Sequence, residues 1–341
     1  MERTNNFHIF TKRNETDVQV YVSCKTYNQA SYITDAMNGF CIQKTDFPYV
    51  CAIFDDCSTD GEQVVIREYM HDHFDMDDAS VVRSEETDDY VLTFAKHKIN
   101  PSCFFLVLFL KYNHYSKSKA KDPYVSEWIN QAKYIALCEG DDYWTDPHKL
   151  QKQVDYMEAH PDCGLVHAYT NSYHQKHNAL SETQLTGELD SSYNDILWAN
   201  PITTLSVLYR KEFTDGYLSF IQGQSWRVGD LPLWLYISLR GKVHKQNFVC
   251  GVYRIVENSE SHGSTYEKRK NYINTIYDVV CFYAEKCGCE GFNKLEQRHY
   301  VELFNEAFFF KKKKDALKAY SFIKNYNAKI LIKRILLCFK H

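Results

Sequence analysis

Apolar and polar residues follow two alternating periods in the first half of the chain. Residues 18–24 alternate apolar and polar side chains, the period of a β-strand, and 33–41 repeat apolar residues at helical spacing. The apolar runs at 49–55, 103–110 and 134–138 also predict buried strands. Strands that alternate with helices predict an α/β fold with a mainly parallel sheet in three α/β/α layers.

The remaining elements are less regular. The pattern indicates a short strand at 80–82 and an acidic, irregular stretch at 84–101. In the second half we expect a strand at 204–209, a helix at 226–241 that begins with an acidic residue, and a strand at 247–254.

These patterns divide the chain into three parts. We expect an N-terminal extension at 1–17, an α/β domain at 18–260, and a helical, basic C-terminal region at 261–341. The α/β domain is expected to consist of two halves, at about 18–160 and 161–260.

Polar clusters follow three of the predicted strands, at 25–28, 55–60 and 139–142. Because the carboxyl ends of parallel strands meet at one edge of a sheet, we expect these clusters to lie on a common rim. The last cluster reads Glu-Gly-Asp-Asp and holds three carboxylates in four positions. Negative charges at such short separations repel one another, so this cluster is either an acidic turn in water or a site for a cation.

Composition narrows the classes of function. With 44% hydrophobic residues in 341 the chain can build a substantial core, and a net charge of −4 argues against nucleic-acid binding. The apolar run at 103–110 is much shorter than the roughly 20 residues of a membrane span, and the first residues lack the apolar core of a signal peptide. The 12 cysteines are scattered, which is typical of reduced thiols. We therefore expect a cytoplasmic protein.

Four motifs occur together in a fixed order, and together they resemble one known family. They resemble the family 2 glycosyltransferases of the GT-A type, and more narrowly the bacterial enzymes that build capsular and other surface polysaccharides. The resemblance covers about residues 18–255. It rests on VYVSCKTYNQ (20–29), FDDCSTDG (54–61), YIALCEGDDYWTDPHKL (134–150) and GDLPLW (229–234).

The resemblance implies a GT-A fold, a nucleotide-diphospho-sugar donor (a UDP-sugar is expected), Mn²⁺ or Mg²⁺ as cofactor, and inversion at the anomeric carbon. Asp142 matches the acid that binds the metal, Asp141 matches the acid near the ribose and the metal, and Glu139 occupies the first position of the extended motif. A divalent ion stabilises the charge that develops on a diphosphate leaving group, and such hard cations prefer oxygen ligands.

Other site residues follow from the same resemblance. Thr26, Tyr27 and Asn28 match the loop on which the base and ribose rest, and Asp56 matches the acid that accepts a hydrogen bond from uracil N3–H. Asp230 matches the general base that takes the proton of the acceptor hydroxyl. The alternatives are a simple turn residue for Asp56 and an N-cap for Asp230.

The chain departs from the family pattern at two places. Lys25 stands where proline or threonine is frequent, and its role is left unassigned. Val256 replaces a common histidine, so that Arg254 or His262 are the alternatives for contacting the phosphates.

Two further segments have weaker signals. The stretch HDHFDMDD at 71–78 invites a second metal site, but a solvated acidic helix end is the preferred interpretation. Residues 326–341 form a basic amphipathic segment in which Ile332, Ile335 and Phe339 share a face. Such a segment suits an anionic membrane surface, or alternatively docking on its own domain or on a partner.

The function predicted from the sequence is transfer of a sugar to a glycan or lipid-linked oligosaccharide, at the inner face of the cytoplasmic membrane, for a bacterial surface glycan. Two alternatives remain. A nucleotidyltransferase that makes a nucleotide sugar would carry a glycine-rich loop after the first strand, which CKTYNQ lacks. A catalytically silent subunit that binds a glycan or nucleotide is the other alternative.

Overall fold

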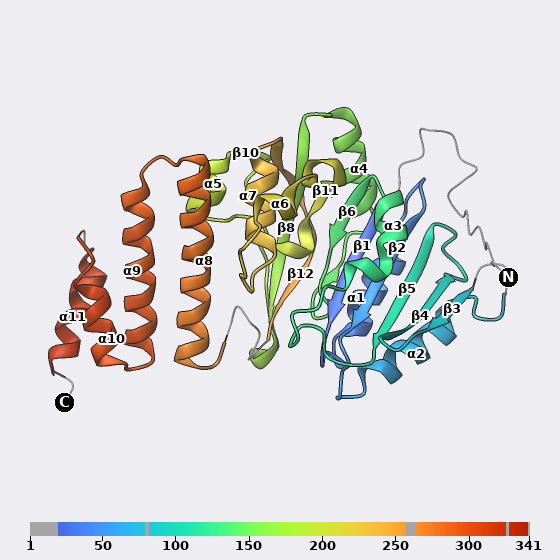
Figure 1. Ribbon diagram of the computed structural model, residues 1–341, viewed down its shortest axis with the longest axis horizontal. Helices are drawn as coiled ribbons and strands as arrows, with labels where there is room; N and C mark the ends of the chain where they lie inside the picture. Colours follow the sequence, from blue (N-terminus) through green and yellow to red (C-terminus); the bar gives the residue numbers. More distant parts are fainter. Residues whose placement is uncertain (1–19, 79–81, 257–262, 325–326, 340–341) are drawn as a thin grey trace.

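The computed structural model describes residues 20–78, 82–256, 263–324 and 327–339 (Figure 1). The predicted extension at 1–17, His262 and most of the strand expected at 80–82 lie outside these residues, as does the side chain of Phe339.

Four parallel strands form the centre of the sheet. Their order is β6, β1, β2, β5, so β1 lies between β2 and β6. Each of the four strands is predominantly apolar and almost wholly buried, as expected for a parallel strand covered on both faces. The bounds are β1 (Val20–Thr26), β2 (Tyr49–Asp55), β5 (Cys103–Leu110) and β6 (Tyr134–Leu137).

Mixed pairing extends the sheet on both sides. Beyond β5 lie the antiparallel strands β4 (Tyr90–Lys96) and β3 (Arg83–Glu86), within the stretch predicted to be irregular. That prediction was wrong: alternate residues Tyr90, Leu92 and Phe94 are buried, and the acidic residues before them obscured this period.

On the other side, β11 (Leu208–Arg210) pairs antiparallel with both β6 and β8 (Cys163–His174), and β12 (Lys242–Ile255) runs parallel to β8. The strand expected at 204–209 is therefore shorter than predicted, because 204–206 form a 3₁₀ turn. Three short strands complete the sheet: β7 (Tyr143–Trp144) and β10 (Leu189–Ser191) pair with β12, and β9 (Ala179–Ser181) pairs with β8.

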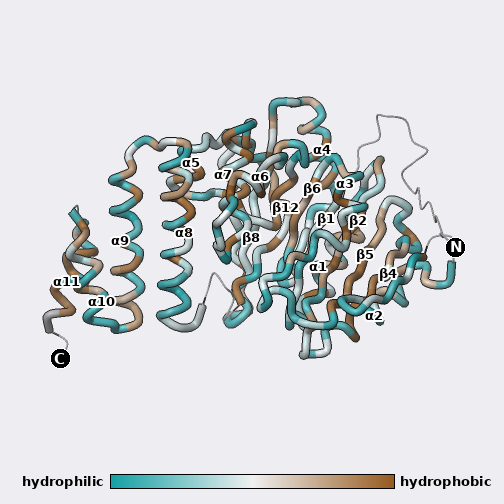
Figure 2. Tube along the Cα trace, viewed as in Figure 1, coloured by the Kyte–Doolittle hydropathy of each residue, from teal (hydrophilic) through white to brown (hydrophobic). Residues whose placement is uncertain are grey.

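Helices cover both faces of this sheet and give the predicted three layers. Alternate residues of β1 and β2 point into two separate cores. One core contains α1 (Ile33–Cys41), α2 (Glu62–His73) and α4 (Lys149–Ala159). The other contains α3 (Ser126–Gln131), α5 (Tyr193–Trp198), α7 (Asp230–Ser238) and the short α6 (Tyr217–Phe220). Figure 2 shows the apolar residues concentrated along the strands between these helices.

The C-terminal region is helical, as predicted. Its helices stand beside the sheet (Figure 1), and the first of them, α8 (Tyr266–Cys287), packs against α7 through a hydrogen bond from the Tyr283 hydroxyl to Pro232 O (2.6 Å). None of the helices in the described part of the chain combines the length and apolar character that a membrane crossing requires. The bounds are α8 (Tyr266–Cys287), α9 (Phe292–Phe309), α10 (Lys313–Tyr320) and α11 (Ala328–Phe339).

Candidate functional site

The three polar clusters lie on one rim, as the sequence predicts. Backbone hydrogen bonds continue past the ends of the strands and join the loops that follow them. The Asp56 N–H donates to Thr26 O (3.1 Å), and the Gly140 N–H donates to Lys25 O (3.2 Å). A side chain at Gly140 would collide with Thr26 and Gln29, so only glycine allows this close approach.

A buried carboxylate that the sequence analysis missed fixes the loops after β1 and β2. Glu62 begins α2 and accepts hydrogen bonds from the Gln29 N–H (2.9 Å), the Ser58 hydroxyl (2.8 Å) and the Thr26 hydroxyl. Burial raises the pKa of Glu62, and these donors oppose that shift. The sequence signal that could have identified Glu62 is its place in the first turn of a predicted helix, directly after the FDDCSTDG motif.

The β1 loop turns its side chains in different directions. The Thr26 hydroxyl is buried against Glu62, whereas Tyr27 is 46% exposed. Asn28 has a φ of 55°, and its side chain accepts the Thr59 N–H (2.8 Å), which ties this loop to the β2 loop. Of the three predicted nucleotide contacts in this loop, Tyr27 and Asn28 are exposed and Thr26 is buried.

Asp56 is enclosed by the segment that follows β5. The carboxylate is 2% exposed and accepts the backbone N–H groups of His114 (2.7 Å) and Tyr115 (3.0 Å). Lys121 Nζ lies 2.7 Å from Oδ2 and forms an ion pair with it. Three donors thus hold Asp56 against the 113–121 loop, and a base could reach this carboxylate only if that loop moved.

The acids of the 139–142 motif differ in their access to solvent. Glu139 is exposed, Asp141 is half-buried, and Asp142 is 3% exposed. Asp142 Oδ1 accepts the backbone N–H of Arg254 (2.7 Å), while Oδ2 has no hydrogen bond within the described residues. Asp142 is therefore anchored at one oxygen, and its other oxygen is left for a ligand.

Arg254 acts as the anchor for this motif. It lies on β12 and is 7% exposed, and its Nε donates to Asp141 O (2.8 Å). Nη1 donates to Gln175 Oε1 (2.9 Å), and Nη2 donates to Asp35 Oδ2 (2.6 Å). The guanidinium thus contacts acceptors of the protein from three sides, which favours a positioning role over a phosphate contact.

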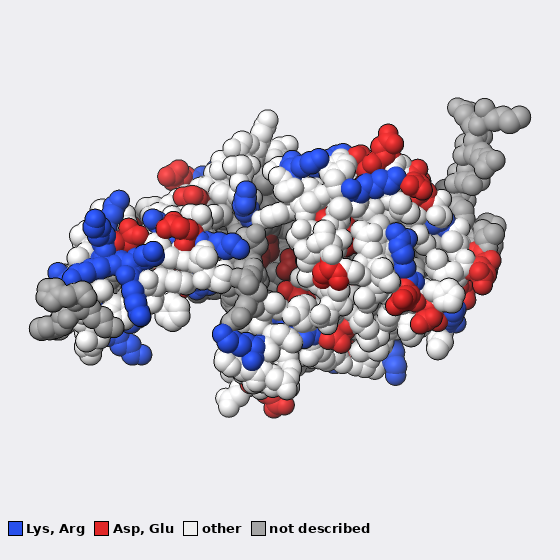
Figure 3. All heavy atoms as spheres, turned by 90° about the horizontal axis from the view of Figure 1, so that it is seen from below, with Lys and Arg blue, Asp and Glu red and all other residues white. Residues whose placement is uncertain are grey.

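Mutual repulsion marks the acids as one electrostatic unit. Although the Glu139 side chain reaches the surface, the surrounding protein atoms exclude much of its water, and this effect together with the charges of Asp141 and Asp230 raises its pKa to about 7, against a lowering by Lys25. Burial also raises the pKa of Asp142, followed by the charge of Asp141. Figure 3 shows acidic side chains recessed in a hollow between the helical region and the sheet.

The donor set fits a divalent ion that is bound together with phosphates. No group of three ligating side chains is assembled among the residues that the structure describes. A Mg²⁺-like ion that shares its coordination with a diphosphate needs only one or two carboxylates, because phosphates and water supply the rest. A cation beside Asp141 and Asp142 would also relieve the repulsion between them.

Asp230 reaches this rim from α7. It is half-buried, and its Oδ2 accepts the Thr204 hydroxyl (3.1 Å) while Oδ1 accepts the adjacent Leu231 N–H (2.8 Å). The residue before the helix is Gly229, so Asp230 lies inside the first turn and is not the N-cap. The alternative interpretation of Asp230 as an N-cap is therefore not what the structure shows.

Two tyrosines lie within the electrostatic influence of Asp230, and the sequence analysis named neither. Tyr217 lies on α6 and Tyr272 on α8, and the charge of Asp230 raises the pKa of both, after the larger effect of burial. The C-terminal helical region thus contributes a residue to the surroundings of the candidate base. No local sequence pattern could have identified this electrostatic neighbour.

Lys25 is exposed, and its side chain has no hydrogen bond or ion pair within the described residues. Its charge lowers the pKa of Glu139, so it acts electrostatically on the acidic rim.

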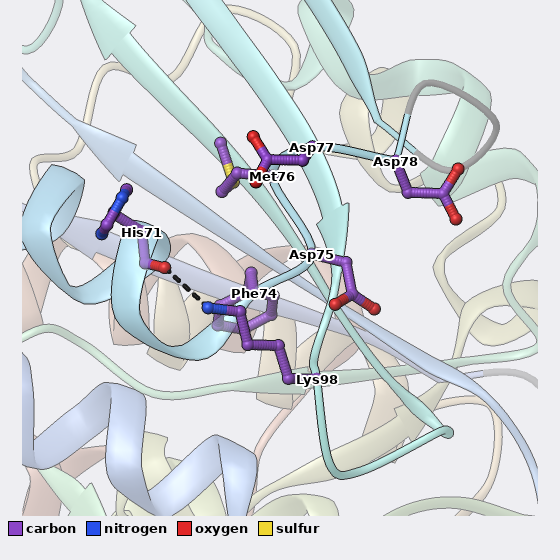
Figure 4. A pocket seen from close by; sticks show the side chains of 7 residues that line it. All are labelled: His71, Phe74, Asp75, Met76, Asp77, Asp78 and Lys98. Atoms are coloured by element: carbon purple, nitrogen blue, oxygen red, sulfur yellow. Dashed lines mark hydrogen bonds between the residues drawn. The ribbon is translucent and has the colours of Figure 1, made fainter.

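The acidic segment at 71–78 lines a separate surface pocket (Figure 4). Lys98 Nζ donates to His71 O (2.9 Å) there, and the carboxylates of Asp75, Asp77 and Asp78 point in different directions. These acids do not converge on a common point.

Comparisons with known proteins place the fold. No family model matches the chain. Uncharacterized proteins of Mycobacterium bovis and Mycobacterium tuberculosis are 33% identical over 188 residues, which are 55% of this chain and 45% of those proteins. The chain therefore spans less than half the length of the curated relatives it matches.

Solved structures give more extensive similarity. TarS 1-349 of S. aureus in complex with UDP-GlcNAc has a TM-score of 0.55 at 14% identity and covers 89% of this chain and 79% of its own. A longer TarS structure gives 0.52 at 12% identity, over 94% of this chain and 52% of that one. A mannosyltransferase of Pyrobaculum calidifontis, in complex with GDP-Man and Mn²⁺, gives 0.49 at 14% identity, over 96% and 82%. The two TarS similarities confirm the predicted fold class.

Proposed function

We propose that this chain is an inverting glycosyltransferase that moves a sugar from a nucleotide-diphospho-sugar to a glycan or lipid-linked oligosaccharide. The observation that carries the proposal is the meeting of Asp230 with the acids of the 139–142 motif. These carboxylates come from α7 and from the loop after β6. Asp230 accepts a hydrogen bond from Thr204, whose 3₁₀ turn packs against β6, and its charge raises the pKa of Glu139. The fold shared with a structure solved with UDP-GlcNAc supports a nucleotide-sugar donor.

The acids of the motif have distinct proposed roles at the diphosphate. A bound Mn²⁺ or Mg²⁺ would supply Lewis-acid stabilisation of the leaving diphosphate. Asp142 Oδ2 and the more open carboxylates of Asp141 and Glu139 would hold that ion. Arg254 keeps Asp142 in place through its backbone N–H, so the ligand oxygen is positioned before the donor binds.

Asp230 is the proposed proton acceptor. Inversion requires the acceptor hydroxyl to attack from the face opposite the diphosphate, and a carboxylate on that side can take its proton. The Thr204 hydroxyl and the Leu231 N–H fix the two oxygens of Asp230.

The nucleotide is proposed to lie over the loops after β1 and β2. Tyr27 offers an exposed ring for stacking on the base, and Asn28 and Thr26 hold the loop through Thr59 and Glu62. Asp56 shapes the same site by holding the 113–121 loop. We propose that Asp56 accepts a hydrogen bond from uracil N3–H only when the 113–121 loop has opened.

Helix α11 is the proposed contact with an anionic membrane, at which a lipid-linked acceptor would be found. One face of α11 packs on its own domain through Ile330 and Leu337, whereas Leu331, Ile332, Ile335 and Leu336 are exposed. Lys and Arg side chains gather at this end of the molecule in Figure 3. Exposed apolar residues beside cations are typical of a helix that lies on an anionic bilayer.

Thermal unfolding with a panel of UDP-, dTDP- and GDP-sugars, with and without Mn²⁺, tests the proposal. A ligand that binds the native state raises its melting temperature, and we expect the largest increase for one UDP-sugar in the presence of Mn²⁺. The control is Asp142→Asn, which keeps an acceptor for the Arg254 N–H but loses the ligand charge, and should lose the Mn²⁺-dependent part. If no nucleotide sugar stabilises the wild-type protein, the proposed function is wrong.

A further inference from the structure

Three consecutive main-chain carbonyls of one turn are held by buried side chains from the segment that follows the acidic motif. The hydrogen bonds run from Trp144 Nε1 to Leu205 O (2.8 Å), from Gln153 Nε2 to Ser206 O (2.8 Å), and from Lys149 Nζ to Val207 O (3.2 Å). All three donor side chains are at most 2% exposed. Because Trp144 lies on β7 and the other two lie on α4, these two elements fix the path of the chain at 204–207.

The same turn carries the contact to the candidate base. It begins with Thr204, whose hydroxyl donates to Asp230 Oδ2 (3.1 Å). The other oxygen of Asp230 accepts the N–H of Leu231, its neighbour on α7. In the part of the chain that the structure describes, Thr204 is therefore the hydrogen-bond donor that holds Asp230 from outside α7.

Lys149 is an unusual residue for a fully buried position. Its ammonium group donates to Gln153 Oε1 (2.7 Å) and to Val207 O, and it lies 4.2 Å from the centroid of the Trp144 ring. It forms no ion pair with a carboxylate of the described residues, and burial lowers its pKa to about 8. A methionine would fill the same space without the cost of burying a charge, so packing alone does not account for this lysine.

The three donors follow the acidic motif directly in the chain. Trp144 lies two positions after Asp142, and α4 comes next. β7 also pairs with β12, on which Arg254 anchors Asp142. One continuous segment therefore fixes both the acids expected at the diphosphate and the turn that holds Asp230.

We propose that Trp144, Lys149 and Gln153 are positioning residues that set the distance between the candidate base and the acids of the 139–142 motif. Because they are buried, they act through the turn and make no contact with a substrate. The inference rests on the proposed function, in which Asp230 takes the proton of the acceptor hydroxyl. A base must lie within hydrogen-bond reach of that proton, and a displacement of about 1 Å can lower the rate by about 10²-fold.

Hydrogen exchange of Gln153→Met, followed by mass spectrometry, tests the coupling without any substrate. Methionine has a similar length, but it cannot donate to Ser206 O or accept from Lys149. We expect faster exchange than in the wild type in peptides that cover 204–207 and 229–235. Faster exchange at 204–207 alone would overturn the proposal, because the turn would then loosen without an effect on Asp230.

The control for the exchange experiment is Tyr49→Phe, at the end of β2 that lies away from the rim. It also loses a buried donor to a main-chain carbonyl, Phe40 O (2.7 Å), and should leave both peptides unchanged. If Gln153→Met does not fold, Trp144→Phe gives the same test, because it keeps an aromatic ring beside the lysine and loses the donor to Leu205 O. No change at 229–235 in a folded variant of either kind would also overturn the proposal.

A rate measurement tests the role in the reaction. The release of nucleoside diphosphate is followed with Mn²⁺ and the nucleotide sugar that stabilises the protein most, with water in place of the acceptor hydroxyl. Thr204→Val and Gln153→Met should each lower kcat by about 10-fold or more and leave KM for the donor nearly unchanged. Thr204→Ser keeps the hydroxyl and should retain most of the activity. A rise in KM with wild-type kcat would assign these residues to donor binding and refute the positioning role.

The double variant Thr204→Val with Gln153→Met decides whether the two residues act in series. Because Gln153 is proposed to act through Thr204, the second change should add little to the loss caused by the first. If the two losses multiply, the proposal is wrong. A wild-type protein that binds no nucleotide sugar would refute the proposed function instead, while the exchange experiment would still decide whether these side chains hold Asp230.

Discussion

The backbone N–H of Arg254 donates to Oδ1 of Asp142 at 2.7 Å, although 112 positions separate the two residues. The contact exists because β7, directly after the acidic motif, pairs with β12, on which Arg254 lies. The same arginine contacts Asp35 on α1 and Gln175. One buried cation on β12 thus links the acidic loop to α1 and to the 3₁₀ turn that contains Gln175.

Replacing this cation should be costly for stability. In Arg254→Leu the half-buried Asp141 and the buried Asp142 lose the guanidinium that lies beside them. We therefore expect a loss of about 3 kcal/mol in the free energy of unfolding. Urea denaturation measures it. Arg227→Leu is the matched control, because Arg227 is exposed and has no hydrogen bond or ion pair within the described residues, and it should change stability by about 0.5 kcal/mol or less. Equal losses in the two variants would contradict the anchoring role of Arg254.

Glu139 should make stability depend on pH when no divalent ion is present. Its ordinary pKa is 4.5, and in the folded protein it is about 7. Between pH 4.5 and about pH 7 the folded state binds more protons than the unfolded state. The contribution of Glu139 to the free energy of unfolding therefore falls as the pH rises through this range, and it is lowest above the range.

Glu139→Gln removes that contribution. Because Glu139 reaches solvent, screening reduces its effect, and at pH 8 we expect the variant to gain about 1 kcal/mol in the free energy of unfolding, or about 2 °C in melting temperature. The gain should vanish at pH 4.5, where the wild-type carboxyl is protonated in the folded state. Glu182→Gln, at an exposed position, is the control and should show no such pH dependence. A constant difference between Glu139→Gln and wild type at all pH values would contradict this prediction.

Asp230→Asn should separate binding from chemistry. The amide keeps an oxygen for one of the two hydrogen bonds but cannot take a proton, so transfer should fall by about 10²-fold or more. Binding of UDP with Mn²⁺, measured by isothermal titration, should change little. Wild-type turnover in this variant would exclude Asp230 as the base.

The exposed face of α11 should determine membrane binding. Ile332 and Ile335 are 57% and 48% exposed, so the double change Ile332→Ser with Ile335→Ser should spare the fold and weaken sedimentation with anionic vesicles. High salt should weaken wild-type binding in the same way, because it screens the lysines. Removal of residues 326–341 is less informative, since Ile330 and Leu337 belong to a core.

The control for this membrane-binding experiment is the double change Val64→Ser with Ile99→Ser, which removes exposed apolar groups on α2 and before β5. It should bind anionic vesicles like the wild type. If both double variants bind equally well, α11 is not the membrane contact.

The sequence by itself determined the central strands and the place of the polar clusters. The period of two in β1 and the apolar runs of β2, β5 and β6 are local signals, and they survive folding because these strands are buried on both faces. Parallel strands then deliver the loops after β1, β2 and β6 to one rim whatever the rest of the chain does. The helical C-terminal region followed from the same kind of local period.

The tertiary structure alone decided which side chains these acids meet. Arg254 reaches Asp142 through the pairing of β7 with β12, and Lys121 reaches Asp56 through the loop after β5. Tyr272 comes near Asp230 only because α8 packs on α7. Each of these contacts joins residues far apart in the chain, and their geometry depends on strand register and helix packing, which a local period of two or 3.6 residues does not encode.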